Sequence, residues 1–327
     1  MVVALLCACG EGDGTDRAPE TSAGSDTDVA TVCAPPQAPA LTVIDQGTIL
    51  TFRALAEGTV EIGRGEPGDV APETWRVGIS TSLDAAEQVQ VFARFKGDGC
   101  EPQPFSHVYD VRAAFPPAAG EPESTAIAMD DPAIVSWATA VASVNYGAEV
   151  EEMFRTPDKA IGPALGTSLD VVALGRGGDI TLAFEPPIAN GDGYDFTVFE
   201  NAFDEGFLEL AFVEVSTDGV SFLRFDSAYL GEVGVGSFET HETTLIGSLA
   251  GKYVQGFGTP FDLTALANRP EAQDGRVDLD HIAFIRIVDV VGDGATTDSF
   301  GRAIYDPYPT SGSAGFDLEA IGVLHQR

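Results

Sequence analysis

The sequence predicts an all-β protein in which a small β-sandwich precedes a larger one. Three observations carry this prediction. Short segments that alternate apolar and polar residues recur along most of the chain. Its 37 glycines and 20 prolines separate these segments at short intervals. The 327 residues, 44% of them hydrophobic, are enough for two domains that each bury a core.

The chain opens with an apolar run, Met1 to Gly10, that is too short to span a bilayer at about 20 residues. Within it, Leu6 to Cys9 resembles the signal-peptidase box of bacterial lipoproteins, which implies that Cys9 is lipidated. We expect residues 1–9 to be a signal remnant and residues 10–34, rich in Gly, Asp, Thr and Ser, to be a flexible linker. The protein would then be exported and lipid-anchored at the bacterial cell surface or outer membrane.

The other two cysteines, Cys33 and Cys100, form an even pair in a chain expected to reach an oxidising compartment. We expect a disulfide between them. Two buried free thiols are the alternative.

Residues 35–118 are predicted to form the smaller, immunoglobulin-like sandwich. In the segment Gln88 to Phe95, apolar and polar residues alternate with the period of a half-buried strand. The run Asp98 to Tyr109 resembles the end of chitobiase-type immunoglobulin-like domains, which usually act as spacers.

Residues 119–327 are predicted to form the larger sandwich, beginning after a Pro- and Gly-rich boundary. One helix is expected from Asp131 to a point before Gly147, with Ile134, Trp137 and Val141 on one face. From about Leu169 onward almost every segment reads as a strand, as in Ile180 to Phe184, Tyr194 to Asn201, Leu208 to Ser216, His281 to Val291 and Gly315 to Leu324.

Four segments of this region resemble galactose-binding-like, discoidin-type jelly rolls of bacterial cell-surface proteins. They are Lys159 to Gly166, Val171 to Phe184, the hairpin Val213 to Phe225 with its turn at Gly219, and Gly315 to Leu324. The resemblance implies a jelly-roll β-sandwich and a non-catalytic binding module, often for glycans and often with a structural calcium ion. A narrower resemblance, Asp195 to Phe203, is to surface proteins of bacterial corrinoid uptake, so capture of a small nutrient such as a corrinoid is the alternative function.

The formal net charge of −34 bears on the partners. Such a surface repels phosphate backbones and anionic headgroups, which excludes nucleic acid and leaves contact with a membrane only through a lipid anchor. The acidity suits divalent cations or neutral ligands. A general adaptation for solubility is the alternative for most of the carboxylates.

Loops dense in oxygen ligands predict calcium, which takes six to eight of them. The candidate metal ligands are Glu200, Asn201, Asp204, Asp293, Asp298, Asp306 and Asp317. Asp317 and Glu319 alternate with apolar residues and share one face of a strand, where burial would require pairing or a metal. The alternative is that this face is exposed to solvent.

A glycan needs an aromatic ring beside polar groups, and Arg302, Tyr305 and Tyr308 offer these in one loop. Tyr253, Phe257 and Phe261 are a second possibility, and loop packing is the alternative for both groups. An enzyme is not expected, because the sequence carries no nucleophile elbow, zinc-helix motif or phosphate loop, and its four histidines are scattered.

Overall fold

The protein is described by a computed structural model. It describes residues 41–46, 49–54, 60–65, 68–72, 74–77, 80–82, 88–95, 105–110, 115–267, 269–299 and 301–327. Cys9, Cys33 and Cys100 lie outside the described residues, so the predicted lipidation and disulfide stay predictions.

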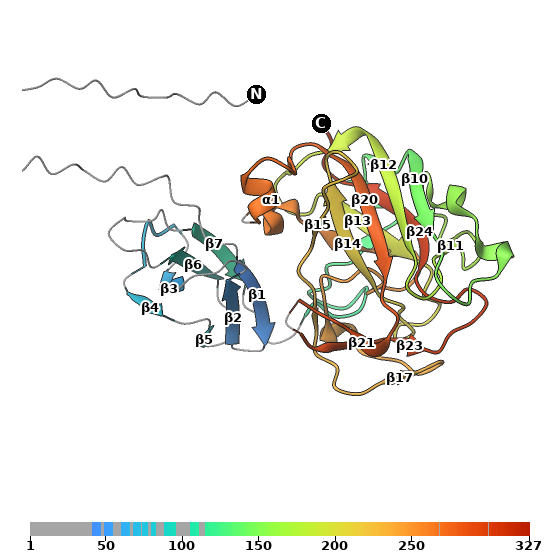
Figure 1. Ribbon diagram of the computed structural model, residues 1–327, viewed down its shortest axis with the longest axis horizontal. Helices are drawn as coiled ribbons and strands as arrows, with labels where there is room; N and C mark the ends of the chain where they lie inside the picture. The colour runs from blue at the N-terminus through green and yellow to red at the C-terminus, as the bar shows by residue number, and fades with distance from the viewer. Residues whose placement is uncertain are drawn as a thin grey trace, which may run out of the picture. The chain divides into compact units, whose positions relative to one another are not determined.

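Two antiparallel sheets occur between residues 41 and 110 (Figure 1). One has the order β1 (Leu41–Gln46), β2 (Ile49–Ala54), β5 (Ser80–Ser82). The other has the order β4 (Trp75–Val77), β3 (Val60–Gly65), β6 (Gln88–Phe95), β7 (Phe105–Asp110). The alternating segment Gln88–Phe95 is thus a strand, as predicted.

Residues 115–327 form two larger antiparallel sheets. The first has the order β10 (Ala140–Asn145), β12 (Asp179–Ile188), β20 (Ile282–Asp289), β14 (Ala211–Ser216), β15 (Leu223–Arg224). The second has the order β11 (Val172–Ala173), β24 (Asp317–Val323), β13 (Phe196–Glu200), β19 (Phe257–Phe261), β8 (Ile127–Ala128), and β9 (Ser136–Trp137) pairs with β24.

Short pairs of strands accompany these sheets: β16 (Ala228–Tyr229) with β18 (Ile246–Gly247), β17 (Val235–Gly236) with β23 (Pro307–Tyr308), and β21 (Asp293–Thr297) with β22 (Ala303–Tyr305). In Figure 1, β17, β21 and β23 lie together at one end of the sheets. The helical turns are Glu152–Phe154, Pro157–Ala160, Thr243–Leu245, Leu263–Leu266 and α1 (Pro270–Gln273). The all-β class that the sequence predicts is confirmed.

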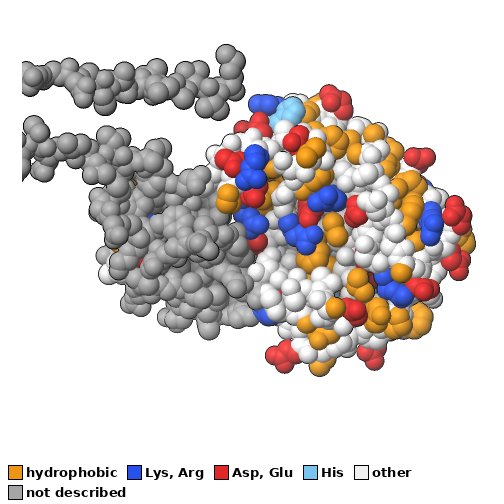
Figure 2. All heavy atoms as spheres, viewed as in Figure 1, with side chains coloured by type: hydrophobic (Ala, Val, Ile, Leu, Met, Phe, Trp, Pro, Cys, Tyr) orange, Lys and Arg blue, Asp and Glu red, His pale blue; other side chains and the backbone are white. Residues whose placement is uncertain are grey.

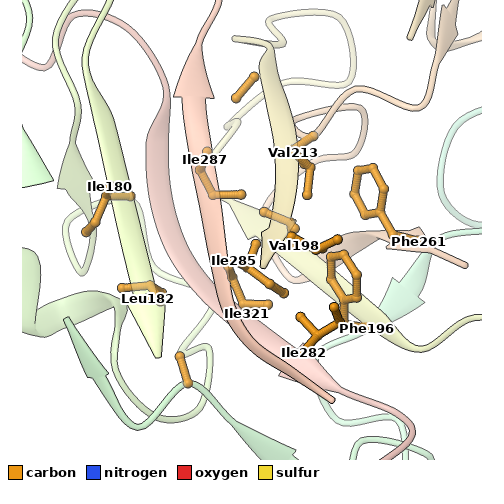
Figure 3. Close-up of a cluster of buried hydrophobic side chains, with 14 of the residues drawn as sticks. Ile180, Leu182, Phe196, Val198, Val213, Phe261, Ile282, Ile285, Ile287 and Ile321 are labelled. Carbon is orange, nitrogen blue, oxygen red and sulfur yellow. The ribbon is translucent and has the colours of Figure 1, made fainter. Parts of the chain in front are cut away.

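Both larger sheets contribute to one hydrophobic core (Figure 3). In β20 the apolar residues Ile285 and Ile287 are buried, whereas Arg286 between them is only half-buried, which is the period of two expected of a strand. Figure 3 shows such side chains from β12, β14 and β20 pointing toward Phe196, Val198 and Ile321 of β13 and β24. Burial of this apolar surface, at about 25 cal/mol per Å², stabilises the pairing of the two sheets.

The predicted hairpin Val213 to Phe225 is present, as β14 and β15. Gly219 has a φ of +72°, the left-handed conformation that glycine adopts without strain. The Asp218 carboxylate accepts hydrogen bonds from the backbone N–H groups of Val220 and Ser221, both at 2.8 Å. The turn is therefore fixed by local chemistry that the sequence displays.

The predicted helix after Asp131 is wrong. Its residues form β9 (Ser136–Trp137) and β10 (Ala140–Asn145), although Asp131 does accept a hydrogen bond from the Ala133 N–H. A bulge in β10, between Val141 and Ser143, shifts its register against β12. Tertiary pairing with β12 and β24 thus overrides a spacing that resembles a helix.

On the face shown in Figure 2, basic side chains gather over β14, β15 and β20, with acidic side chains beside them. Glu214 binds both Arg224 and Arg286. The two guanidinium groups lie over the rings of Phe212 and Phe222, at 4.2 and 3.9 Å from the ring centroids. The charged residues of this outer sheet face are thus engaged with one another.

Among the described residues, no helix has the length and apolar character needed to cross a bilayer.

Candidate functional site

Six carboxylates are buried where β13, β20 and β24 end or begin. We call Glu200, Glu209, Asp289, Asp306, Asp317 and Glu319 the carboxylate cluster. Each is at most 5% exposed. Asp317 and Glu319 lie on β24, and Glu200 of β13 is opposite Leu318 between them. The alternative that this face of β24 is exposed to solvent is therefore wrong.

Burial, with added mutual repulsion, raises the pKa values within the cluster. Burial raises the pKa of Glu200 well above its usual range, and the charges of Asp317 and Glu319 raise it further. Burial also raises the pKa of Glu209, with added repulsion from Asp317, Glu200 and Asp306. Burial therefore favours the neutral form of these carboxyl groups, and a positive charge beside them would favour the ionised form.

Asp289 and Asp317 have raised pKa values of about 7. Burial is the main cause for Asp289, and the N–H groups of Gly177 and Phe316, each 2.7 Å from a carboxylate oxygen, oppose it together with Arg176. Burial is also the main cause for Asp317, where hydrogen bonds from Ser313 and Asn201 oppose it. Both groups consequently change charge near neutral pH.

Two oxygens of the cluster lack partners. Among the described residues, no donor reaches Oδ1 of Asp317 or Oε2 of Glu319, although both atoms are buried. The other Glu319 oxygen accepts from the N–H groups of Leu165 and Gly166, at 2.7 and 2.5 Å. A buried oxygen without a donor costs about 1 to 3 kcal/mol, and a bound cation would remove that cost.

The predicted metal ligands fall into separate places. Glu200, Asn201 and Asp317 lie together, and Asp306 belongs to the same cluster and accepts a hydrogen bond from the Leu210 N–H at 3.0 Å. Asp204 and Asp293 are exposed and bind backbone N–H groups of their own loops. In the described part of the chain, no three His, Cys, Asp or Glu side chains already converge in a geometry that could hold a metal ion.

Asp298 has another set of partners. It is 4% exposed and accepts hydrogen bonds from the N–H groups of Tyr229 and Arg302 and from Nε of Arg302, all at 2.9 Å. It therefore orients the Arg302 guanidinium.

Glu209 is a member of the cluster that was not among the predicted ligands. Glu209 stands between Leu208 and Leu210 in an apolar run, and a lone carboxylate in such a run is the signal that could have found it.

A pocket of about 580 Å³ is lined by residues that include Tyr305, the residue before Asp306 of the cluster. It is lined by Tyr229, Leu230, Gly231, Glu232, Arg302, Ala303 and Tyr305. The rings of Tyr229 and Tyr305 meet edge to face, with centroids 6.4 Å apart. Gly294 makes room for the Tyr305 ring, because a β-carbon there would lie 2.3 Å from it. Tyr305 thus lines the pocket while the next residue, Asp306, belongs to the carboxylate cluster.

Two of the three predicted ligand residues line this pocket, namely Arg302 and Tyr305. Tyr308 does not: it pairs with Gly236 in the parallel β17–β23 ladder, and the Arg176 guanidinium lies 5.5 Å from its ring centroid. The second predicted group of glycan-binding aromatic residues is wrong in Tyr253 and Phe261. These side chains are 1% and 3% exposed and belong to the hydrophobic core.

Asp195, at the other end of β13, is a buried carboxylate with a complete set of partners. One of its oxygens accepts from the Gly191 N–H at 2.7 Å and lies 3.0 Å from Nδ1 of His325. The other accepts from the Leu263 N–H at 2.7 Å. Burial raises the pKa of Asp195, and these hydrogen bonds pull it back.

No protein-family model matches the chain, and no curated protein is significantly similar to it in sequence.

Proposed function

We propose that the chain is a non-catalytic binding module of the bacterial cell surface, which holds a glycan in the pocket and is stabilised by calcium at the carboxylate cluster. In this proposal the two larger sheets are the layers of a galactose-binding-like jelly roll. A small immunoglobulin-like sandwich precedes it, and a lipid on Cys9 anchors the exported protein.

The pocket is the observation that carries the proposal. A sugar ring packs on an aromatic side chain while its hydroxyl groups bind polar groups, and the pocket offers Tyr305 beside Arg302 and Glu232. Because Asp298 is ion-paired with Arg302, the guanidinium charge is already offset. A neutral sugar therefore suits the pocket better than an anionic one.

The carboxylate cluster supports the calcium part. Glu200, Glu209 and Asp317 would hold the ion, and the Asn201 amide oxygen would add a neutral ligand. Oδ1 of Asp317 fits this role because it is buried and accepts no hydrogen bond from the described residues. Calcium would supply two positive charges against the mutual repulsion of the cluster. The ion would have to draw these side chains together.

A glycan array probed with the full chain, followed by calorimetric titration of the best neutral glycan, tests the pocket. Tyr305→Ala should weaken binding at least about tenfold, because it removes the stacking ring. Tyr308→Ala is the matched control and should leave the affinity unchanged, since Tyr308 lies outside the pocket lining.

A corrinoid belongs in the same titrations. Nutrient capture would be favoured instead if the protein bound a corrinoid but no glycan of the array, and if Tyr305→Ala abolished the corrinoid binding. Glycan binding that is indifferent to Tyr305→Ala would contradict the pocket assignment.

A further inference from the structure

Three phenylalanine rings form a row in which a half-buried ring, Phe207, lies between two exposed ones, Phe203 and Phe238. We call it the phenylalanine row. The Phe203 and Phe207 ring centroids are 4.8 Å apart, and those of Phe207 and Phe238 are 6.5 Å apart, with near-parallel planes in both pairs. Phe203 is 67% exposed and Phe238 is 88% exposed. Rings this exposed are unfavourable in water, and gathered exposed apolar side chains mark interaction surfaces.

The two loops that carry the row are firmly held together. The His241 N–H donates to the Gly206 carbonyl at 3.0 Å, and a β-carbon on Gly206 would lie 2.3 Å from Thr240. The buried His241 ring bonds to the Leu208 carbonyl and the Tyr229 hydroxyl, at 2.9 and 3.2 Å. The row is thus a built surface, preformed for a partner.

The surroundings of the row are acidic. Asp204, Glu205, Glu239 and Glu242 are all exposed on the same two loops. Residues 201–223 and 225–251 contain no Lys or Arg. Burial lowers the pKa of His241, which favours the uncharged form of this imidazole. The patch therefore combines an apolar centre with a negative rim.

We propose that the phenylalanine row docks a segment of another protein that alternates apolar residues with Lys or Arg. Apolar side chains of the segment cover the ring edges. Its cations meet the rim carboxylates and the open faces of Phe203 and Phe238, where cation–π attraction adds to the ion pairs. None of the three phenylalanines lines the glycan pocket, so the row provides a second, protein-directed function.

Charge complementarity favours this occupant over two others. An anionic bilayer would be repelled by the rim carboxylates. A second copy of the chain carries the same net charge of −34, so its surface repels the rim as well. A basic segment satisfies the apolar centre and the rim together.

The test titrates the full chain with a synthetic peptide of alternating leucine and lysine, monitored by calorimetry. The unmodified protein should bind it, and the double variant Phe203→Ser/Phe238→Ser should bind at least about tenfold more weakly. Val220→Ser is the matched control, because Val220 is a comparably exposed apolar residue, 82% exposed, on the β14–β15 turn. Its affinity should equal that of the unmodified protein.

Charge is tested by Glu205→Gln/Glu242→Gln, which should weaken binding and flatten its dependence on salt. A peptide of alternating leucine and glutamate should not bind. Equal binding of the lysine peptide by the double phenylalanine variant would overturn the proposal, since attraction would then be nonspecific. Binding to phosphatidylserine vesicles, or self-association in sedimentation, would also overturn it if the phenylalanine replacements abolished that behaviour.

Discussion

Strand β13 has a buried carboxylate at each end, and the two ends differ in how that charge is accommodated. Asp195, just before the strand, receives hydrogen bonds from Gly191 and Leu263 and contacts His325. Glu200, at its last residue, shares its surroundings with Asp317 and Glu319. At the first end the carboxylate is stabilised by hydrogen bonds within the protein. At the second end the carboxylates repel one another, so a bound proton or cation would stabilise them.

The largest expected effect is a loss of stability as the pH rises. With calcium chelated, Asp289 and Asp317 keep a proton up to a pKa of about 7, whereas in the unfolded chain they lose it near 3.8. Each group should therefore lower the free energy of unfolding by about 1.4 kcal/mol per pH unit as the pH rises through this window, with no further loss above it. Urea unfolding at several pH values measures the slope. Asp317→Asn should remove the contribution of one group from this slope. An unchanged slope would contradict the raised pKa of Asp317.

Asp195→Ala should be the most damaging single substitution of the comparison. It leaves the buried N–H groups of Gly191 and Leu263 without acceptors, at a cost of about 3 to 5 kcal/mol. Denaturant unfolding checks the loss, which should be equal with calcium and with chelator. Asp192→Ala, at an exposed neighbour, is the control and should be nearly neutral.

Removal of calcium should act on the Glu200 end. At a calcium concentration a hundredfold above the dissociation constant, the ion should add about 2.7 kcal/mol to the free energy of unfolding. Differential scanning calorimetry with calcium against chelator measures this difference. Identical melting temperatures in the two buffers would refute calcium at the carboxylate cluster.

Glu209→Gln should give the smallest change and the most selective one. Glutamine removes a carboxyl group whose ionisation opposes burial, so the stability of the chelated protein should rise by about 1 kcal/mol while the response to calcium diminishes. The same calorimetry checks both effects. Glu205→Gln, on the exposed loop before it, should alter neither.

The all-β class was predictable because some strands show clear alternation, as in Gln88–Phe95 and Ile282–Asp289, and because the turn at Gly219 is encoded locally. The predicted helix after Asp131 failed for the opposite reason. Its apolar spacing suits a helix in isolation, but Trp137 pairs with Gly322 of β24, a residue far along the chain that local spacing cannot reveal.

The site was predictable in part. Glu200, Asn201 and Asp317 were each predicted as metal ligands, and the register of β13 on β24 brings them together. Local composition could not reveal that Asp204 and Asp293 stay at the surface. Arg302 and Tyr305 are close in the sequence and both line the pocket. Tyr308 pairs with Gly236 and does not line it.

Tyr305 and Asp306 are consecutive, one facing the pocket and the other the carboxylate cluster. In the proposal, the sugar would contact Tyr305 and the ion would lie in the cluster that contains Asp306, so one peptide bond links the two proposed sites. Thermodynamic reciprocity then requires that any tightening of sugar binding by the ion be returned as an equal tightening of ion binding by the sugar. The protein would release its ligand when the surrounding fluid becomes poor in calcium.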